Sequence, residues 1–109
     1  MKIGFYVNTA KRNAKAALKP LTEKARSLGL VVTENLSEAE VLITLGGDGT
    51  ILRAVHEFDS VSILGFNLGG LGYLSAVGEE DFELALKMLA TGAYKVSPRT
   101  MLEVKKQGG

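Results

Sequence analysis

The 109-residue sequence contains no cysteine, a single histidine and only two prolines. The absence of cysteine excludes disulfide bridges and thiolate-based metal or redox sites, and it is compatible with a cytoplasmic location. The net charge is +1 and the basic residues are dispersed, so no electrostatic footprint for nucleic acid is present. No apolar stretch approaches the length of a membrane span, and the first ten residues lack a signal-peptide core. We therefore expect a soluble cytoplasmic domain with neither nucleic-acid nor membrane partners.

The sequence does contain short apolar runs that alternate with helical periodicity. The runs predict strands at residues 2–8, 30–34, 41–46, 61–67 and 100–104. Apolar residues spaced three and four apart predict helices over residues 14–28, 51–58 and 82–89. This alternation indicates an α/β fold of three layers, in which helices flank an open, mostly parallel sheet.

Proline and glycine mark the expected helix boundaries. Pro20 lies inside the first helical pattern and predicts either a bend or a second helix that has Pro20 in its first turn. Gly29 and Gly92 follow helical patterns and are expected to end them.

The most informative segment is GGDGT, residues 46–50, which lies between a predicted strand and a predicted helix. Open parallel sheets bind ligands in such loops, and successive backbone N–H groups at a helix start attract phosphate. The alternative is a tight turn in which Asp48 or Thr50 caps the helix. Capping explains the aspartate and one glycine, but not three glycines around a carboxylate. We therefore favour a functional loop.

A second glycine cluster, NLGGLGYL at residues 67–74, follows the next predicted strand. It is not the six-residue dinucleotide fingerprint, and no helical pattern starts directly after it. Because the two loops follow neighbouring strands, we expect both at one edge of the sheet.

Together, GGDGTILRA and NLGGLGYL resemble the NAD kinases, which phosphorylate the 2′-hydroxyl of the adenosine ribose of NAD to give NADP. The resemblance runs from the first strand to RTMLEV (residues 99–104) and corresponds to the amino-terminal part of that family. Diacylglycerol and sphingosine kinases share GGDGT, and phosphofructokinases carry a related motif. The lipid kinases usually continue with asparagine-glutamate, where this chain has Leu52 and Arg53.

The resemblance implies roles for seven residues. Asp48 would be the general base and would also contact the dinucleotide. Arg53 would contact the nucleotide, against the alternative of a solvated arginine, and Tyr73 would line the NAD site, against that of a core tyrosine. The expected phosphate-binding residues, which use backbone N–H groups and one hydroxyl, are Gly46, Gly47, Gly49 and Thr50.

Other candidates receive structural interpretations. We expect His56 on the protein surface, and a structural role is more plausible than a catalytic one for Arg99, which matches a basic residue of the family. No side chains show metal-ligand spacing, so Mg²⁺ or another divalent cation would arrive with ATP or polyphosphate.

The chain also departs from the family pattern. The family more often has phenylalanine at Tyr73 and a larger polar residue at Gly70. Its carboxy-terminal domain supplies an asparagine–acidic pair and a glycine/serine/threonine-rich loop that this chain lacks. We expect residues 1–96 to form the α/β nucleotide-binding domain and 97–109 to begin a strand leading into a missing domain. The chain alone should then be inactive, and the full-length enzyme a homo-oligomer. A non-catalytic nucleotide-binding fragment and a lipid kinase are the alternatives.

Overall fold

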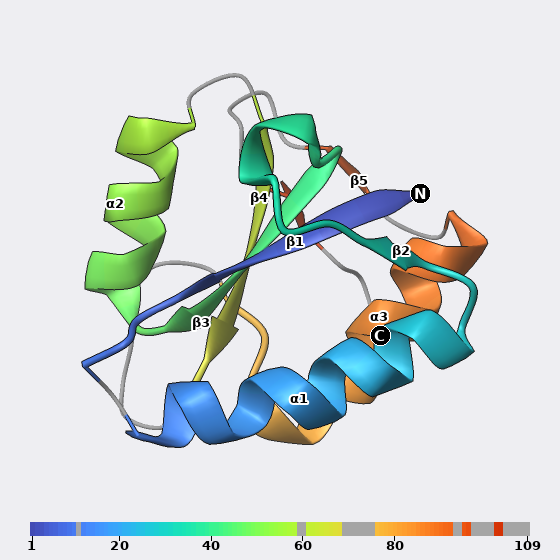
Figure 1. Ribbon diagram of the computed structural model, residues 1–109, viewed down its shortest axis with the longest axis horizontal. Coiled ribbons are helices and arrows are strands. Elements are labelled where there is room, and N and C mark those ends of the chain that lie inside the picture. The colour runs from blue at the N-terminus through green and yellow to red at the C-terminus, as the bar shows by residue number, and fades with distance from the viewer. Residues whose placement is uncertain (11, 59–60, 69–75, 93–94, 97–101, 104–109) are drawn as a thin grey trace.

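The computed structural model describes residues 1–10, 12–58, 61–68, 76–92, 95–96 and 102–103. At its centre is a parallel sheet in the order β2-β1-β3-β4. Its strands are β1 (Lys2–Val7), β2 (Val31–Val32), β3 (Val41–Gly46) and β4 (Ser62–Asn67). Helices α1 (Arg12–Ser27) and α3 (Phe82–Thr91) cover one face of the sheet, and α2 (Asp48–Glu57) covers the other (Figure 1). The three-layer α/β fold predicted from the sequence is confirmed.

Shorter elements complete the described chain. Two 3₁₀ turns are present, η1 (Leu36–Glu38) after β2 and η2 (Glu79–Asp81) before α3. A separate antiparallel pair consists of β5 (Lys95–Val96) and β6 (Leu102–Glu103). The sequence predicted a strand at residues 100–104, where the structure has β6, and it did not predict β5.

Strand β3 is the centre of the core, and all six of its residues are buried. Its residues alternate between the two faces of the sheet, as strand geometry requires. Ile43 and Leu45 belong to the larger apolar cluster beneath α1 and α3, whereas Leu42 packs with Ile51 and Ala54 of α2. A strand that is apolar on both sides fits only between two helical layers.

Helix α2 lies very close to β4. A Cβ atom added to Gly65 would lie 2.6 Å from Cδ1 and 3.0 Å from Cγ1 of Ile51. Only glycine at this position lets the Ile51 side chain rest directly on the strand backbone. This contact fixes the height of α2 above the sheet, and therefore the position of its first turn.

The predicted helix ends are confirmed at both glycines. Gly92 is the C-cap of α3 in the left-handed conformation (φ 78°), and Gly29 follows α1 with φ 88°. The prediction of a second helix at Pro20 is wrong, because α1 runs unbroken from Arg12 to Ser27. Pro20 cannot donate to the carbonyl of Ala16, but both residues are exposed, so water can reach that carbonyl. None of the described helices is long and apolar enough to cross a membrane.

Candidate functional site

The direction of the chain reverses at the carboxyl ends of β1 and β3. These strands are neighbours, but the chain leaves β1 through α1 on one face and leaves β3 through α2 on the other (Figure 1). Open α/β sheets bind ligands at such a switch point. The two strand ends are joined by a hydrogen bond in which the backbone N–H of Asn8 donates to the carbonyl of Leu45 (3.1 Å).

Gly46 ends β3 directly against the first turn of α2. A Cβ atom there would collide with Oγ1 of Thr50 and would lie 3.2 Å from Cβ of Asn8. Thr50 itself is only 2% exposed, and its hydroxyl is one of two buried side-chain groups without a hydrogen-bond partner in the described part of the chain. The close approach therefore explains why residue 46 is glycine, and it leaves a hydroxyl enclosed beneath the loop.

Gly49 has no comparable packing reason. It is the second residue of α2, its φ is not positive, and a Cβ atom added to it would meet nothing within 4 Å. Glycine in a helix costs about 1 kcal/mol relative to alanine. The fold would thus be more stable with alanine here. The glycine instead leaves the exposed start of α2 without side-chain atoms at this position.

The capping interpretation of this loop is wrong. The N-cap of α2 is Gly47, which has an extended conformation and makes no side-chain capping bond. Asp48 is the first residue of the helix and is half-buried. Thr50 is the third residue, and its hydroxyl bonds to no described group.

Asp48 and Arg53 lie on different flanks of α2. At about 100° per residue they are roughly 140° apart around the helix axis. Arg53 is on the flank near β1, where its charge acts on Tyr6. Asp48 lies closer in angle to Ile51, which contacts Gly65 of β4. The two residues therefore leave the helix on different flanks, Asp48 on the flank nearer β4 and Arg53 on the flank nearer β1.

Tyr6 connects β1 to this flank of α2. Its ring meets the Phe58 ring edge-on, with 6.1 Å between centroids and an interplanar angle of 78°. Burial and the adjacent Glu57 carboxylate raise the pKa of the Tyr6 hydroxyl above its ordinary value of 10.0, and the Arg53 charge partly opposes this rise.

The second glycine cluster starts beside the first. The N–H of Leu68 donates to the carbonyl of Gly46 (3.0 Å), and the N–H of Asn67 donates to that of Val77 (2.8 Å). The described beginning of NLGGLGYL thus lies at the same sheet edge as GGDGT, as the sequence predicts. Residues 69–75, with Gly70 and Tyr73, and residue 99 lie outside the described residues.

Sequence reasoning missed Asn8, which follows β1 and lies against Gly46. It stands at the end of the first predicted strand, which carries no recognisable motif. Only the pairing of β1 with β3 identifies it as a neighbour of GGDGT.

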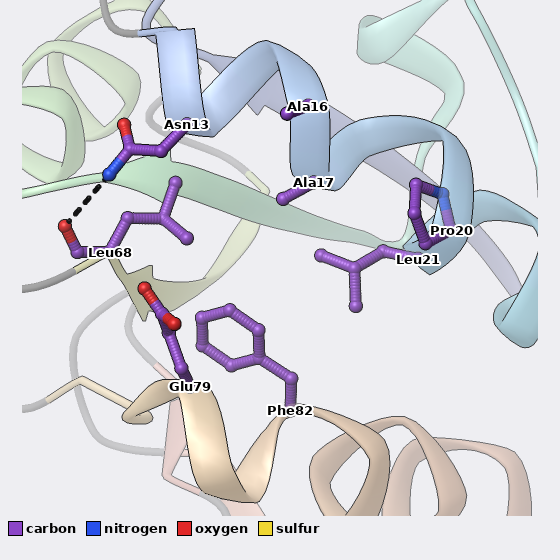
Figure 2. A pocket seen from close by; sticks show the side chains of 8 residues that line it. All are labelled: Asn13, Ala16, Ala17, Pro20, Leu21, Leu68, Glu79 and Phe82. Carbon is purple, nitrogen blue, oxygen red and sulfur yellow. Dashed lines mark hydrogen bonds between the residues drawn. The ribbon is translucent and has the colours of Figure 1, made fainter.

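A separate hollow of about 320 Å³ lies on the opposite face of the sheet, between α1 and the start of α3 (Figure 2). It is lined by Asn13, Ala16, Ala17, Pro20, Leu21, Leu68, Glu79 and Phe82. Nδ2 of Asn13 donates to the carbonyl of Leu68 across it (3.4 Å), and Glu79 supplies the charged group. An apolar lining with a carboxylate does not suit phosphate, so this hollow is not the anion site.

The described residues contain no group of three histidine, aspartate or glutamate side chains placed to hold a metal ion. His56 is exposed, which confirms its predicted surface position.

Comparison with known proteins agrees with the motifs. Residues 2–94 match the family model described as the ATP-NAD kinase N-terminal domain. The chain is 38% identical to the NAD kinase of Clostridium botulinum (strain Eklund 17B), over 92% of this chain and 40% of that protein. It is 41% identical to the NAD kinase of Carboxydothermus hydrogenoformans, over 68% of this chain and 27% of that protein. It is 28% identical to the NAD kinase of Chlorobaculum tepidum, over 100% of this chain and 45% of that protein. The chain thus spans less than half the length of these curated relatives.

Proposed function

Because the chain belongs to the NAD kinase family, as its amino-terminal domain, we propose that it supplies the phosphate-binding loop and the catalytic base of an NAD kinase. The reaction transfers the terminal phosphoryl group of ATP or polyphosphate to the 2′-hydroxyl of the adenosine ribose of NAD, giving NADP. The cytoplasm is the proposed location, and a homo-oligomer is the proposed state of the complete enzyme.

The observation that carries the proposal is the absence of a side chain at Gly49, in the first turn of α2. The first N–H groups of a helix have no intrahelical acceptor, and the helix dipole places partial positive charge beside them. With no side chain at Gly49, a phosphate can approach these groups closely. Since the fold gains nothing from this glycine, ligand approach is the reason we assign to it.

Asp48 is the residue that we propose as the base. It is the first residue of α2, is half-buried at the switch point, and is followed directly by Gly49. In the proposed step the ribose oxygen attacks the terminal phosphorus while Asp48 accepts its proton. The new O–P bond forms as the bond to the leaving phosphate oxygen breaks, and the donor departs as ADP or shortened polyphosphate.

The remaining residues bind and orient. Arg53 would neutralise phosphate charge from the β1 side, and Gly46 and Gly47 would offer backbone contacts. Thr50 Oγ1 is enclosed beneath Gly46, so it would reach a phosphate only after a shift of the loop backbone. Tyr73, in the second glycine cluster, would line the dinucleotide site. Mg²⁺ would enter bound to the phosphoryl donor and shield its charge.

The alternative is a non-catalytic nucleotide-binding module, which is favoured by one observation. The chain covers 40% of the Clostridium botulinum relative, so contacts made by the rest of that protein lie outside these 109 residues. Holding both reactants in register contributes about 7–11 kcal/mol to a bimolecular reaction, and half a site cannot supply it. We therefore propose that the 109-residue chain alone is inactive.

The experiment is a measurement of NADP formation from NAD with Mg²⁺–ATP or polyphosphate. It compares this chain alone with a protein that joins it to the remaining length of a close relative, and the joined protein with its Asp48→Asn variant. Activity of the joined protein that Asp48→Asn reduces about 10²–10⁴-fold supports the proposal. Equal activity of the two joined proteins contradicts the assignment of Asp48, and equal activity of the short and joined chains contradicts the need for a second half.

A further inference from the structure

Helix α1 is strongly basic in a chain that is otherwise slightly acidic. It contains five lysine and arginine residues and one acidic residue, Glu23, which gives the helix a net charge of +4. The whole chain has a net charge of +1, so the residues outside α1 together carry −3. Basic residues that are spread over several turns of sequence are therefore brought together on one helix by the fold.

Three of these residues form a stripe along the amino-terminal half of α1. Arg12, Lys15 and Lys19 are spaced three and four apart, and all three are exposed. At about 100° per residue they lie within roughly 60° of one another, on the side away from the buried residues Ala14 and Leu21. Within the described part of the chain, none of the three has an ion-pair partner. We call these three residues the basic stripe.

The basic stripe does not stabilise the helix. Like charges three and four residues apart repel each other and cost about 0.2–0.5 kcal/mol per pair. A cation in the first turn also opposes the helix dipole, and the first turn of α1 contains no acidic residue. Solvation of an exposed helix face is served equally well by charges of both signs. An anionic ligand would compensate for this repulsion and would account for a stripe of one sign.

The basic stripe begins at the sheet edge where GGDGT lies. Nδ2 of Asn13, the residue after Arg12, donates to the carbonyl of Leu68 (3.4 Å; Figure 2). The N–H of Leu68 in turn donates to the carbonyl of Gly46 (3.0 Å), so two hydrogen bonds connect the first turn of α1 to GGDGT. Figure 1 shows that α1 and α2 both begin at this end of the sheet. Because helix side chains lean toward the amino terminus, those of the stripe extend toward this edge.

We propose that Arg12, Lys15 and Lys19 form a subsite that holds the distal phosphates of a polyphosphate donor whose terminal phosphate lies at GGDGT. The proposal rests on the proposed function, in which ATP or polyphosphate is the donor, and it adds a preference for long donors. The stripe spans about 10 Å of the helix axis, so it suits a chain of repeated charges better than one compact anion. The phosphates of ATP end in adenosine, which is uncharged and offers these cations nothing.

The test compares the binding of tripolyphosphate and of long-chain polyphosphate to the chain by isothermal titration calorimetry, at equal ionic strength and equal concentration of chain ends. The stripe variant combines Arg12→Gln, Lys15→Gln and Lys19→Gln, because glutamine is also a good helix former. A control variant has the same change in net charge farther from this sheet edge, in the last turn of α1 and in α3. It combines Lys24→Gln, Arg26→Gln and Lys87→Gln. Urea unfolding checks that both variants are folded.

Long-chain polyphosphate should bind the wild-type chain about tenfold more tightly than tripolyphosphate, which is the effect of three exposed charge contacts of ordinary strength. The stripe variant should lose this advantage while keeping the wild-type affinity for tripolyphosphate, and the control variant should keep both affinities. If the stripe variant binds the long chain as tightly as wild type does, the proposal is wrong. An equal loss in the control variant also overturns it, because net charge alone would then explain the binding.

Two further measurements ask whether the basic stripe belongs to the donor site. Gly49→Ala should weaken binding of both polyphosphates, since the terminal phosphate of each lies at that loop; unchanged binding of the long chain would show a separate polyanion surface and refute the proposal. Tighter binding to the stripe by a thymidine oligonucleotide, or by vesicles that contain phosphatidylserine, would assign it to nucleic acid or to a membrane instead. None of these results decides the proposed function, which depends on the separate Asp48→Asn measurement with ATP as the donor.

Discussion

Replacing either of two buried threonines by valine should stabilise the chain, but only one of the two substitutions should weaken ligand binding. Thr44 in β3 and Thr50 in α2 are 0% and 2% exposed, and neither hydroxyl has a hydrogen-bond partner among the described residues. Burying a hydroxyl without a partner costs about 1–3 kcal/mol. Valine has nearly the same shape, so Thr→Val removes this cost without opening a cavity. Each substitution should therefore raise the free energy of unfolding by about 1–2 kcal/mol.

The measurement is urea unfolding of the chain followed by far-UV circular dichroism, with the slope m unchanged between variants. For a domain of this size, about 1 kcal/mol corresponds to a rise in Tm of roughly 4–8 °C. A loss of stability on Thr50→Val would refute the reasoning, because it would show that the Thr50 hydroxyl makes a favourable bond in the ligand-free protein.

Adding ligand separates the two positions. A ligand that binds only the folded state stabilises it in proportion to the logarithm of its concentration over Kd. With inorganic pyrophosphate, the Thr44→Val variant should keep the full stabilisation of the wild-type chain, since Thr44 lies within the sheet. Thr50→Val should lose part of it if the hydroxyl reaches phosphate once the loop at Gly46 shifts. Equal stabilisation of both variants would remove Thr50 from the binding site.

Three further predictions concern single positions. Gly49→Ala should raise the free energy of unfolding by about 1 kcal/mol and weaken pyrophosphate binding; tighter or unchanged binding would show that the missing side chain does not serve a ligand. Gly65→Ala should destabilise the chain by about 1–3 kcal/mol in urea unfolding, because the new methyl group would overlap Ile51, and a neutral result would show that α2 can lift from β4. The raised pKa of Tyr6 means that its contribution to stability is complete below about pH 10 and is lost as the pH rises through the folded-state value. Tyr6→Phe should therefore lose less stability than wild type as the pH rises above about 10, and identical pH curves would contradict this.

Local pattern was sufficient to predict the fold because the strands and helices alternate so regularly. The run at residues 41–46 is apolar on both faces, and residues 51–58 repeat at helical spacing, so β3 and α2 follow directly from the sequence. Of the two alternatives expected at Pro20, a bend or a second helix, the second helix is wrong, because an exposed helix surface tolerates a missing N–H that a buried one would not. The antiparallel pair of β5 with β6 depends on contacts between short segments, which a periodic pattern does not contain.

The site was predictable only where a motif marked it. The GGDGT motif identified the loop, but the sequence does not show why each position is glycine. Gly46 leaves room for the Thr50 side chain, whereas a Cβ atom at Gly49 would meet no neighbouring atom. Residues that reach the site through strand pairing, as Asn8 does, cannot be recognised until the sheet order is known. The flank on which Arg53 lies likewise depends on which strand borders α2 on each side.

The two edges of the sheet bear on how this chain behaves at high concentration. One edge is β2, which is only two residues long, and the other is β4, where Val77 bonds to Gly65 and Asn67. A long, straight edge strand with free N–H and C=O groups is a template for pairing with other chains and for aggregation. In the described part of this molecule, neither edge offers such a row: β2 is short, and part of β4 is covered. The long apolar strand β3, which would be the most hazardous if exposed, is instead enclosed between β1 and β4. The order of the strands thus places the shortest strand and a partly covered strand at the two edges of the described sheet, so that this sheet itself offers little for strand pairing with other chains.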